Sequence, residues 1–164
     1  MNPCPCGYYN HPEKECMCAP GVVHRYLNKI SGPLLDRIDL HVEVTPVPFS
    51  KLSEAALSEK SHEIRERVIK AREIQNVRYA ESESIYCNAQ MGSKQLREIC
   101  RIEKEGQDLL KTAMDRLGLS ARAYDRILKV SRTIADLEGS ENIQTHHLAE
   151  AIQYRSLDRE GWAG

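Results

Sequence analysis

Apolar and polar side chains alternate strictly over residues 38–44, which read Ile-Asp-Leu-His-Val-Glu-Val. Successive side chains of a strand point to opposite faces, so this alternation predicts a strand with one buried face. Pro46 and Pro48 follow the alternating residues and are expected to end the strand. A lone strand has an unpaired edge, which would invite pairing with another strand.

The pattern changes to helical spacing between about Ser53 and Tyr79, where Glu, Lys and Arg are abundant. Ile64, Val68 and Ala71 recur along one side of this segment. The segment is therefore predicted to form one long helix with a narrow apolar stripe that packs on one side only.

Helical periodicity continues from about Ser93 to Asp158. Ser93 and Ser120 are expected to cap helices, while Gly118 and Gly139 are expected to end them. Four short amphipathic helices are predicted, with apolar faces at Leu96 and Ile99; at Leu109, Leu110, Ala113, Met114 and Leu117; at Tyr124, Ile127, Leu128, Ser131, Ile134 and Ala135; and, after Thr145, at Leu148 and Ile152. Such helices form a small bundle.

Composition narrows the class of protein only slightly. The chain has 164 residues, a length that suits one domain or one and a half. Its formal net charge is −1 with 29% charged residues, so the protein has no overall basic field that would indicate nucleic-acid binding. Aromatic residues are sparse, so few side chains could stack on single-stranded bases. No apolar stretch is long enough to span a bilayer, and no apolar signal segment opens the chain, so the cytoplasm is the expected location.

Four cysteines near the start of the chain carry the clearest chemical signal. They form two close pairs, Cys4 with Cys6 and Cys16 with Cys18, separated by a loop rich in turn-forming residues. Paired thiolates at such spacing can supply the four ligands of a tetrahedral zinc ion. The sequence therefore predicts a structural zinc knuckle.

Two alternatives to zinc stay open. Within each pair a single residue lies between the two cysteines, whereas most zinc knuckles have two residues there. The same four cysteines could instead form two disulfides or remain reduced thiols. His11 and His24 are possible substitute ligands. The adjacent His146 and His147 fall in the first turn of a predicted helix and are expected to face solvent.

The residues assign no activity by their spacing alone. The chain contains no GxxxxGK[ST] phosphate loop, no apolar run ending in paired acids that could hold Mg²⁺, and no evident Ser/His/Asp or Cys/His set.

Several stretches nevertheless closely resemble the C-terminal third of the magnesium-chelatase-like AAA+ ATPases of the ComM (YifB) family. They are Met1-Asn2-Pro3-Cys4-Pro5-Cys6-Gly7, Arg25-Tyr26, residues 29–40 (KISGPLLDRIDL), residues 119–128 (LSARAYDRIL) and residues 134–138 (IADLE). The resemblance covers nearly the whole chain. It implies a fragment of a larger protein whose Walker A and Walker B motifs lie elsewhere.

The resemblance also implies roles for three residues. Asn2, followed by Pro3, matches the sensor 1 asparagine that holds the attacking water and the γ-phosphate, and its amide can both donate and accept. Arg37 matches an arginine finger that reaches the nucleotide of a neighbouring subunit, where a guanidinium stabilises charge on the transferring phosphoryl group. Arg122 matches the sensor 2 arginine of the lid.

Other assignments for these arginines remain open. Arg126 and Arg25 are fallback candidates. Without the resemblance, Arg37 would be expected to pair with Asp36 or Asp39 on the surface, and Arg122 with a neighbour such as Asp125.

The resemblance implies a mainly α fold: the end of an AAA+ α/β core, with one or two strands and the cysteine knuckle, followed by a helical lid bundle. Residues 1–48 would form the end of the AAA+ core, and residues 90–164 would form the helical lid. Residues 49–89 would form a long helix and a loop that connect the core to the lid. The full-length protein would be a ring-forming ATPase, a hexamer using ATP and Mg²⁺ and acting on DNA in branch migration, with no membrane partner. The alternatives are a chelatase-like or chaperone-like protein-remodelling ATPase, or an inert helical interaction module. The fragment alone is expected to be inactive.

Overall fold

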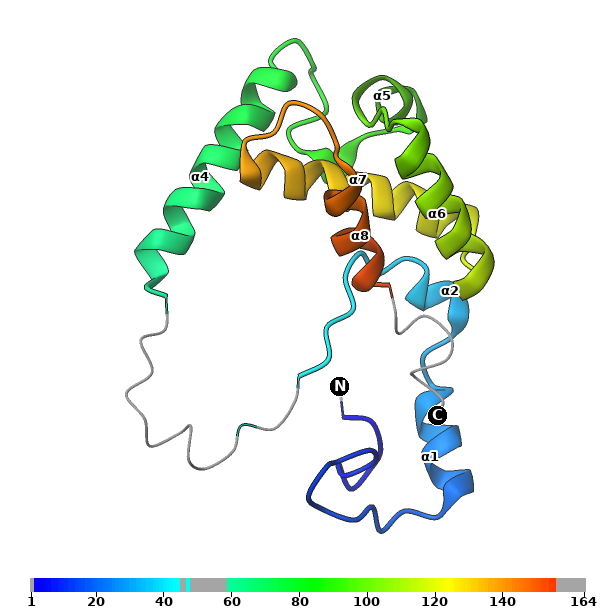
Figure 1. Cartoon of the computed structure of the whole chain (residues 1–164). Coiled ribbons are helices and arrows are strands. Elements are labelled where there is room, and N and C mark those ends of the chain that lie inside the picture. The colour runs from blue at the N-terminus through cyan, green and yellow to red at the C-terminus, as the bar shows by residue number, and fades with distance from the viewer. Residues whose placement is uncertain (1, 45–46, 48–58, 156–164) are drawn as a thin grey trace.

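A computed structural model describes residues 2–44, 47 and 59–155. The described chain folds into helices joined by loops, which confirms the mainly α class (Figure 1). The elements are α1 (Pro20–Leu27), α2 (Gly32–Leu35), α4 (Ser61–Arg78), the 3-10 turn η1 (Asn88–Gln90), α5 (Ser93–Ile99), α6 (Lys104–Leu117), α7 (Ala121–Glu138) and α8 (Thr145–Gln153). Over the described ranges, no helix is long and apolar enough to cross a membrane.

The predicted ends of the bundle helices are confirmed where side-chain or glycine chemistry sets them. The Ser120 side chain accepts a hydrogen bond from the Ala123 N–H at 3.3 Å and caps α7. Gly118 (φ 56°) ends α6 and Gly139 (φ 77°) ends α7, both in the left-handed conformation that glycine adopts at little cost. Ser93 is the first residue of α5, and Gly92 occupies the cap position instead.

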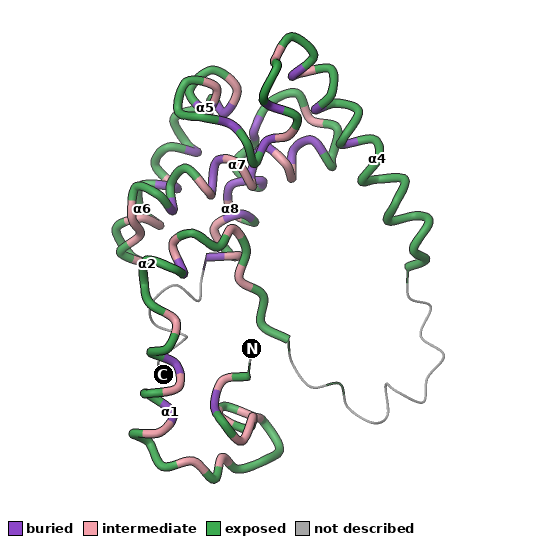
Figure 2. Tube along the Cα trace, turned by 180° about the vertical axis from the view of Figure 1, so that it is seen from behind, coloured by how far each residue is buried: buried purple, intermediate pink, exposed green. Residues whose placement is uncertain are grey.

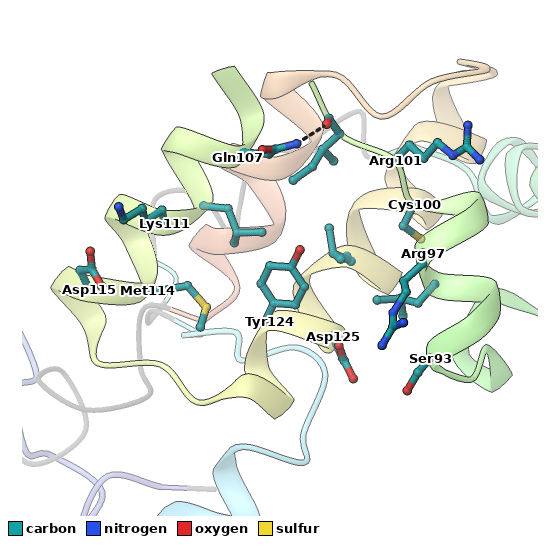
Figure 3. A pocket seen from close by; sticks show the side chains of 14 residues that line it. Ser93, Arg97, Cys100, Arg101, Gln107, Lys111, Met114, Asp115, Tyr124 and Asp125 are labelled. Atoms are coloured by element: carbon teal, nitrogen blue, oxygen red, sulfur yellow. Dashed lines mark hydrogen bonds between the residues drawn. The ribbon is translucent and has the colours of Figure 1, made fainter. Parts of the chain in front are cut away.

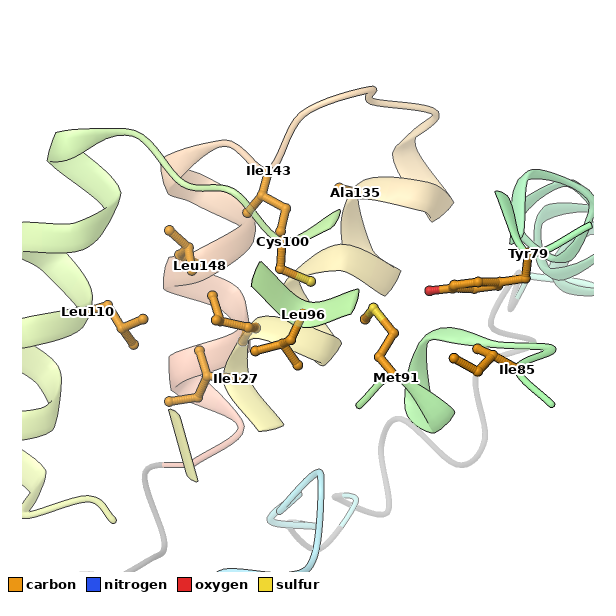
Figure 4. Close-up of a cluster of buried hydrophobic side chains, with 12 residues drawn as sticks. Tyr79, Ile85, Met91, Leu96, Cys100, Leu110, Ile127, Ala135, Ile143 and Leu148 are labelled. Carbon is orange, nitrogen blue, oxygen red and sulfur yellow. The ribbon is translucent and has the colours of Figure 1, made fainter. Parts of the chain in front are cut away.

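The bundle core lies between α7 and α8, with α6 packed on α8 and α5 on α7 (Figure 4). Leu110, Ile127 and Leu148 are at most 1% exposed at its centre. Gly106 lies on α6 where that helix approaches α8, and a Cβ there would come within 2.7 Å of Leu148 Cδ1. Glycine thus allows the close packing of these two helices.

The long helix α4 packs on the bundle only with its C-terminal half (Figure 2). Ala71 is buried, as the predicted stripe requires, but Ile64 and Val68 on the same stripe are 44% and 47% exposed. The helix begins at Ser61 rather than at Ser53, and residues 48–58 lie outside the described residues. The prediction that α4 packs on one side is thus correct, but the bundle contacts only the C-terminal part of the apolar stripe.

A buried polar network fixes the end of α4 to α7. Asp136, with a fully buried side chain, accepts hydrogen bonds from the guanidinium groups of Arg78 (2.5 and 2.7 Å) and Arg132 (3.1 Å). Asn88 donates to Asp136 at 2.7 Å and accepts from the Tyr79 hydroxyl at 2.8 Å. Burial of these charges carries a desolvation cost, and the ion pairs and hydrogen bonds to the carboxylate offset it.

The strand predicted over residues 38–44 is not confirmed. These residues form no strand, and neither does any other part of the described chain, so no neighbouring strand is available to complete a backbone ladder. Leu40, Val42 and Val44 are 47%, 65% and 88% exposed. The alternation identified side chains suited to a buried face, but it could not supply the partner that a strand needs. Pro46 and Pro48 lie outside the described residues.

A second, smaller core lies in the N-terminal region, apart from the bundle (Figure 2). Cys4, Val23 and Leu27 are buried there, with the other three cysteines of the pairs and Tyr9 packed against them. Val23 and Leu27 come from α1, which begins with Pro20 at its first position. This proline and the Val23–Leu27 spacing are local sequence signals from which α1 could have been predicted.

Candidate metal centre and nucleotide-contact residues

The four cysteine sulfurs predicted to hold zinc converge on one point. All four Sγ atoms lie within 4.8 Å of one another. The Cys4–Cys6, Cys4–Cys16 and Cys6–Cys16 sulfur distances are 3.3, 3.7 and 3.6 Å. Thiolates about 2.3 Å from a central ion at the corners of a tetrahedron would be separated by about 3.8 Å. The spacing thus fits a single zinc ion, and all four cysteines are free of disulfides.

Tight turns bring the two pairs of cysteines together. The Gly7 N–H donates to the Cys4 carbonyl oxygen at 3.1 Å, and Gly7 has φ 83°, which favours glycine. Asn10 also has a positive φ of 59°, and the next residue, His11, accepts hydrogen bonds at Nδ1 from the backbone N–H groups of Glu13 and Lys14. His11 therefore shapes the loop and is not needed as a ligand.

The thiols influence one another strongly. The backbone N–H of Tyr8 lowers the pKa of Cys6 to about 6. For Cys16, the N–H of Cys18 acts in the same direction, but burial and the neighbouring thiol groups outweigh it and raise the pKa to about 12. The pKa of Cys18 is also raised. Thiolates this close repel each other, and a cation between them would remove that repulsion.

The three residues matched to nucleotide contacts are all exposed. Asn2 lies beside the knuckle, with its side-chain nitrogen 3.6 Å from the position that a Cβ on Gly7 would take. Arg37 follows α2, and Arg122 lies in the first turn of α7. In the described part of the chain neither arginine forms an ion pair, and Asp39 instead pairs with Arg126 at 3.0 Å. The predicted local pairs of Arg37 and Arg122 are thus not formed with described residues.

The loop that carries Arg37 is held against the bundle. The Asp39–Arg126 ion pair joins it to α7, and the His41 N–H donates to the Tyr154 carbonyl oxygen at 2.9 Å, just after α8. Arg155, which is 1% exposed, donates to the carbonyl oxygens of Leu35 (3.4 Å) and Ile38. Sequence reasoning missed Arg155 because no local pattern marks a contact across more than a hundred residues.

The prediction that His147 faces solvent is wrong. Its side chain is fully buried, whereas His146 is 63% exposed. Nδ1 of His147 accepts a hydrogen bond from the Gln144 N–H at 2.9 Å and caps α8. The neutral ring therefore carries its proton on Nε2, which donates to Glu138. His146 also bonds to Glu138, at 2.8 Å, and these histidines lower the pKa of that carboxyl group.

Glu138 and the two histidines have the ligand atoms of a metal site within 4.8 Å of one another. A metal on Nε2 of His147 would require the proton to move to Nδ1, where it would face the Gln144 N–H. The cap of α8 and metal binding therefore exclude each other, and the cluster is a hydrogen-bonded cap.

A groove of about 1040 Å³ lies between α5, α6 and α7 (Figure 3). Leu96, Leu110 and Leu128 line it with apolar surface, and Arg97, Lys111 and Asp125 lie among its charged residues. Neither Arg37 nor Arg122 lines this groove. The groove is thus separate from the arginines that resemble nucleotide contacts.

Comparisons with known proteins cover both parts of the chain. The family profile of the magnesium chelatase subunit ChlI C-terminal region matches residues 58–155, and that of the magnesium chelatase subunit ChlI matches residues 1–52. The chain is 44% identical over 160 residues to Competence protein ComM of Haemophilus influenzae. It is 42% identical over 160 residues to the uncharacterized protein YifB of Escherichia coli. Each alignment covers 97% of this chain and 30% of the relative.

The chain thus spans less than a third of the length of these relatives, and its likeness to them extends through both the knuckle and the bundle. Because one family profile matches more than half of the chain, the chain belongs to the magnesium chelatase subunit ChlI family, through its C-terminal region, and is similar to ComM and YifB.

Proposed function

We propose that this chain is the lid and arginine-finger part of a ring-forming, cytoplasmic AAA+ ATPase that acts on DNA. The supporting comparison is the 44% identity to a protein named for competence. The role on DNA is what the resemblance to the ComM family implies. The supporting geometry is that Arg37 and Arg122 are both exposed and free of ion pairs with described residues, on elements that the Asp39–Arg126 pair joins. A finger and a sensor must be exposed to reach a nucleotide.

In this proposal each residue has one role toward ATP and Mg²⁺, which bind mainly to parts of the protein outside this chain. Arg37 donates to the transferring phosphoryl group from the adjacent subunit of a hexamer. Arg122 contacts the γ-phosphate and links nucleotide state to the lid. Asn2 orients the attacking water. The domains would be residues 1–48, 49–89 and 90–164. The two separate cores support a division between the N-terminal region and the rest, and Tyr79 and Ile85 of the middle segment contribute to the bundle core.

The chain by itself is expected not to hydrolyse ATP. It lacks a phosphate loop and a pair of acids for Mg²⁺, and its three candidate residues supply only peripheral contacts. Turnover above background in a preparation free of contaminating ATPase would contradict the assignment of this chain as a part.

The decisive experiment uses Arg37→Ala in the full-length protein. A finger stabilises charge that develops only in the transition state, so turnover should fall by about 10²-fold or more while nucleotide affinity stays nearly intact. Arg37→Lys should not restore turnover, because an ammonium lacks the planar fork of donors. Mixing Arg37→Ala with a Walker A mutant should restore some activity at shared interfaces.

Arg116→Ala is the matched control. Arg116 is an exposed arginine in the last turn of α6 and is not a candidate nucleotide contact, so its removal should leave turnover unchanged. Wild-type turnover in Arg37→Ala would overturn the finger assignment. Stimulation of the ATPase by protein and not by DNA would favour a protein-remodelling machine, the alternative to which the magnesium chelatase family name points.

A further inference from the structure

The loop of residues 36–41, called the finger loop below, is anchored at both ends by groups of the bundle. Arg155 is 1% exposed and lies just beyond α8, at the end of the described chain. Its guanidinium donates to the carbonyl oxygens of Leu35 and Ile38, which are three residues apart. These two carbonyl groups flank Arg37, so one planar group fixes the backbone on both sides of the proposed finger.

Two further contacts hold the same loop to the bundle. The Asp39 carboxylate lies 3.0 Å from Arg126 Nη1 on α7, and both side chains are partly exposed. The His41 N–H donates to the Tyr154 carbonyl oxygen at 2.9 Å. Figure 1 shows this loop beside the C-terminal end of α8, as the backbone bond requires. The finger loop is thus held by Arg126 on α7 and by Tyr154 and Arg155, which follow α8.

The finger loop lies outside the described helices. Two turn hydrogen bonds join its start to α2, from the Arg37 N–H to the Leu34 carbonyl oxygen and from the Ile38 N–H to the Leu35 carbonyl oxygen, both at 3.0 Å. It forms no strand, and its apolar residues Ile38 and Leu40 are 38% and 47% exposed. A catalytic cation must be held within about 0.5 Å of its productive position by groups that are themselves fixed. Arg155 is such a group, because burial and its two acceptors restrict its side chain.

The same contacts connect the loop to Arg122. Arg126 follows Arg122 by four residues on α7, so the two lie on one face of the helix about 6 Å apart along its axis. A shift of α7 would therefore move Arg122 and, through Arg126 and Asp39, the finger loop.

We propose that Arg155 is a positioning residue for Arg37, and that Arg155 with the Asp39–Arg126 pair clamps the finger loop to the lid so that Arg37 and Arg122 move as one body. The clamp would couple the nucleotide sensed by the lid to the finger presented to the neighbouring subunit. The catalytic consequence rests on the proposed function, whereas the clamp can be tested without ATP hydrolysis.

The first test measures amide hydrogen exchange in the 164-residue chain. Arg155→Ala should raise the exchange rates of the Arg37, Ile38 and His41 amides by about tenfold. These amides donate to the carbonyl oxygens of Leu34, Leu35 and Tyr154, respectively. Amides of α6 should not change. Arg155→Lys, which can serve one carbonyl but not both, should give an intermediate rate. Arg116→Ala, which removes an exposed arginine on α6, is the matched control and should change nothing.

If the circular dichroism of Arg155→Ala shows that this variant does not fold, a pair of charge reversals tests the clamp instead. Asp39→Arg and Arg126→Asp alter partly exposed side chains, so both variants should fold. Each should loosen the finger loop, and the double variant should restore protection. Unchanged exchange in the loop in folded Arg155→Ala, or in both single reversals, would overturn the clamp.

The second test uses the full-length protein. Arg155→Ala should lower kcat by about tenfold and leave KM for ATP within about twofold, because the finger acts only on the transition state. The double variant Arg37→Ala/Arg155→Ala should be no slower than Arg37→Ala alone, since a positioning residue has nothing left to position. Full additivity of the two losses would show a merely structural role and overturn the positioning assignment.

The two tests separate the two claims. A full-length protein without ATPase activity contradicts the proposed function while leaving the exchange result valid. Unchanged exchange contradicts the clamp whether or not ATP is hydrolysed.

Discussion

The knuckle and the bundle are stabilised in different ways. Among the residues that the structure describes, twelve form the buried core of the bundle, whereas Cys4, Val23 and Leu27 form that of the knuckle. Regions below about 40 residues usually need a metal, disulfides or oligomerisation, because they bury too little apolar surface. The knuckle sulfurs lie at the spacing of a zinc tetrahedron, so a metal would supply the cross-link that apolar burial cannot.

Two regions of this chain are thus ordered for different physical reasons. The bundle depends on many small apolar and polar contacts, so single changes should weaken it in a graded way. The knuckle depends on four ligands at one point, so loss of one ligand should remove most of its stabilisation. The following experiments perturb one region while the other serves as an internal reference.

The largest expected effect is on the knuckle. Removal of zinc by a chelator, or Cys4→Ser, should remove a stabilisation that reaches on the order of 10 kcal/mol in zinc-finger peptides. Amide exchange over residues 7–15 should rise sharply, while the circular dichroism of the bundle persists. Elemental analysis should find one zinc per chain before chelation. Cys87→Ser, at a cysteine outside the cluster, should keep the zinc, and purified protein without zinc would contradict this prediction.

A smaller but still large effect is expected when the polar network of the bundle is broken. Asp136→Ala leaves the guanidinium groups of Arg78 and Arg132 beside a buried site without their carboxylate, which should cost about 3–5 kcal/mol. Denaturant unfolding followed by circular dichroism measures this loss. The exposed Asp108→Ala on α6 should change the stability by less than about 0.5 kcal/mol. Loss of zinc in Asp136→Ala would show that the two regions are not independent.

The same carboxylate makes the bundle sensitive to acid. Burial raises the pKa of Asp136, but hydrogen bonds from Arg78 and Asn88 outweigh burial and lower it overall. A lowered folded-state pKa stabilises the protein above the unfolded value of about 3.9, and that contribution is lost as the pH falls through the folded value. Unfolding free energy measured from pH 6 downwards should therefore fall below about pH 4. Asp136→Asn should be less stable at neutral pH and show a shallower decline with acid.

The smallest effect concerns one local signal of the bundle. Ser120→Ala removes the side-chain acceptor of the Ala123 N–H at the start of α7 and should cost about 1 kcal/mol. Ser120→Asp, which keeps an acceptor at the cap, should retain most of the stability in the same denaturation experiment. An alanine variant as stable as the parent would show that packing alone fixes the start of α7.

Local patterns made much of this structure predictable. Ser120, Gly118 and Gly139 marked helix ends correctly because a cap or a left-handed residue acts within one turn of its own position. The spacing of Cys4, Cys6, Cys16 and Cys18 likewise indicated that their sulfur atoms lie close together. Two close pairs need only a short turning loop between them to bring all four sulfurs to one site. The resemblance of Arg37 and Arg122 to functional arginines also came from sequence, and their roles stay predictions.

The burial of polar groups and the contacts between distant segments depend on how the helices pack. His147 looked like a surface residue because its burial depends on Glu138 and on the packing of α8 against α7. The alternation of residues 38–44 indicated a strand, but strand formation needs a partner that no local pattern provides. Arg155 reaches Leu35 and Ile38 across more than a hundred residues. Elements with local causes can thus be predicted from the sequence, whereas contacts whose free energy depends on desolvation and distant partners follow from the packing of the folded chain.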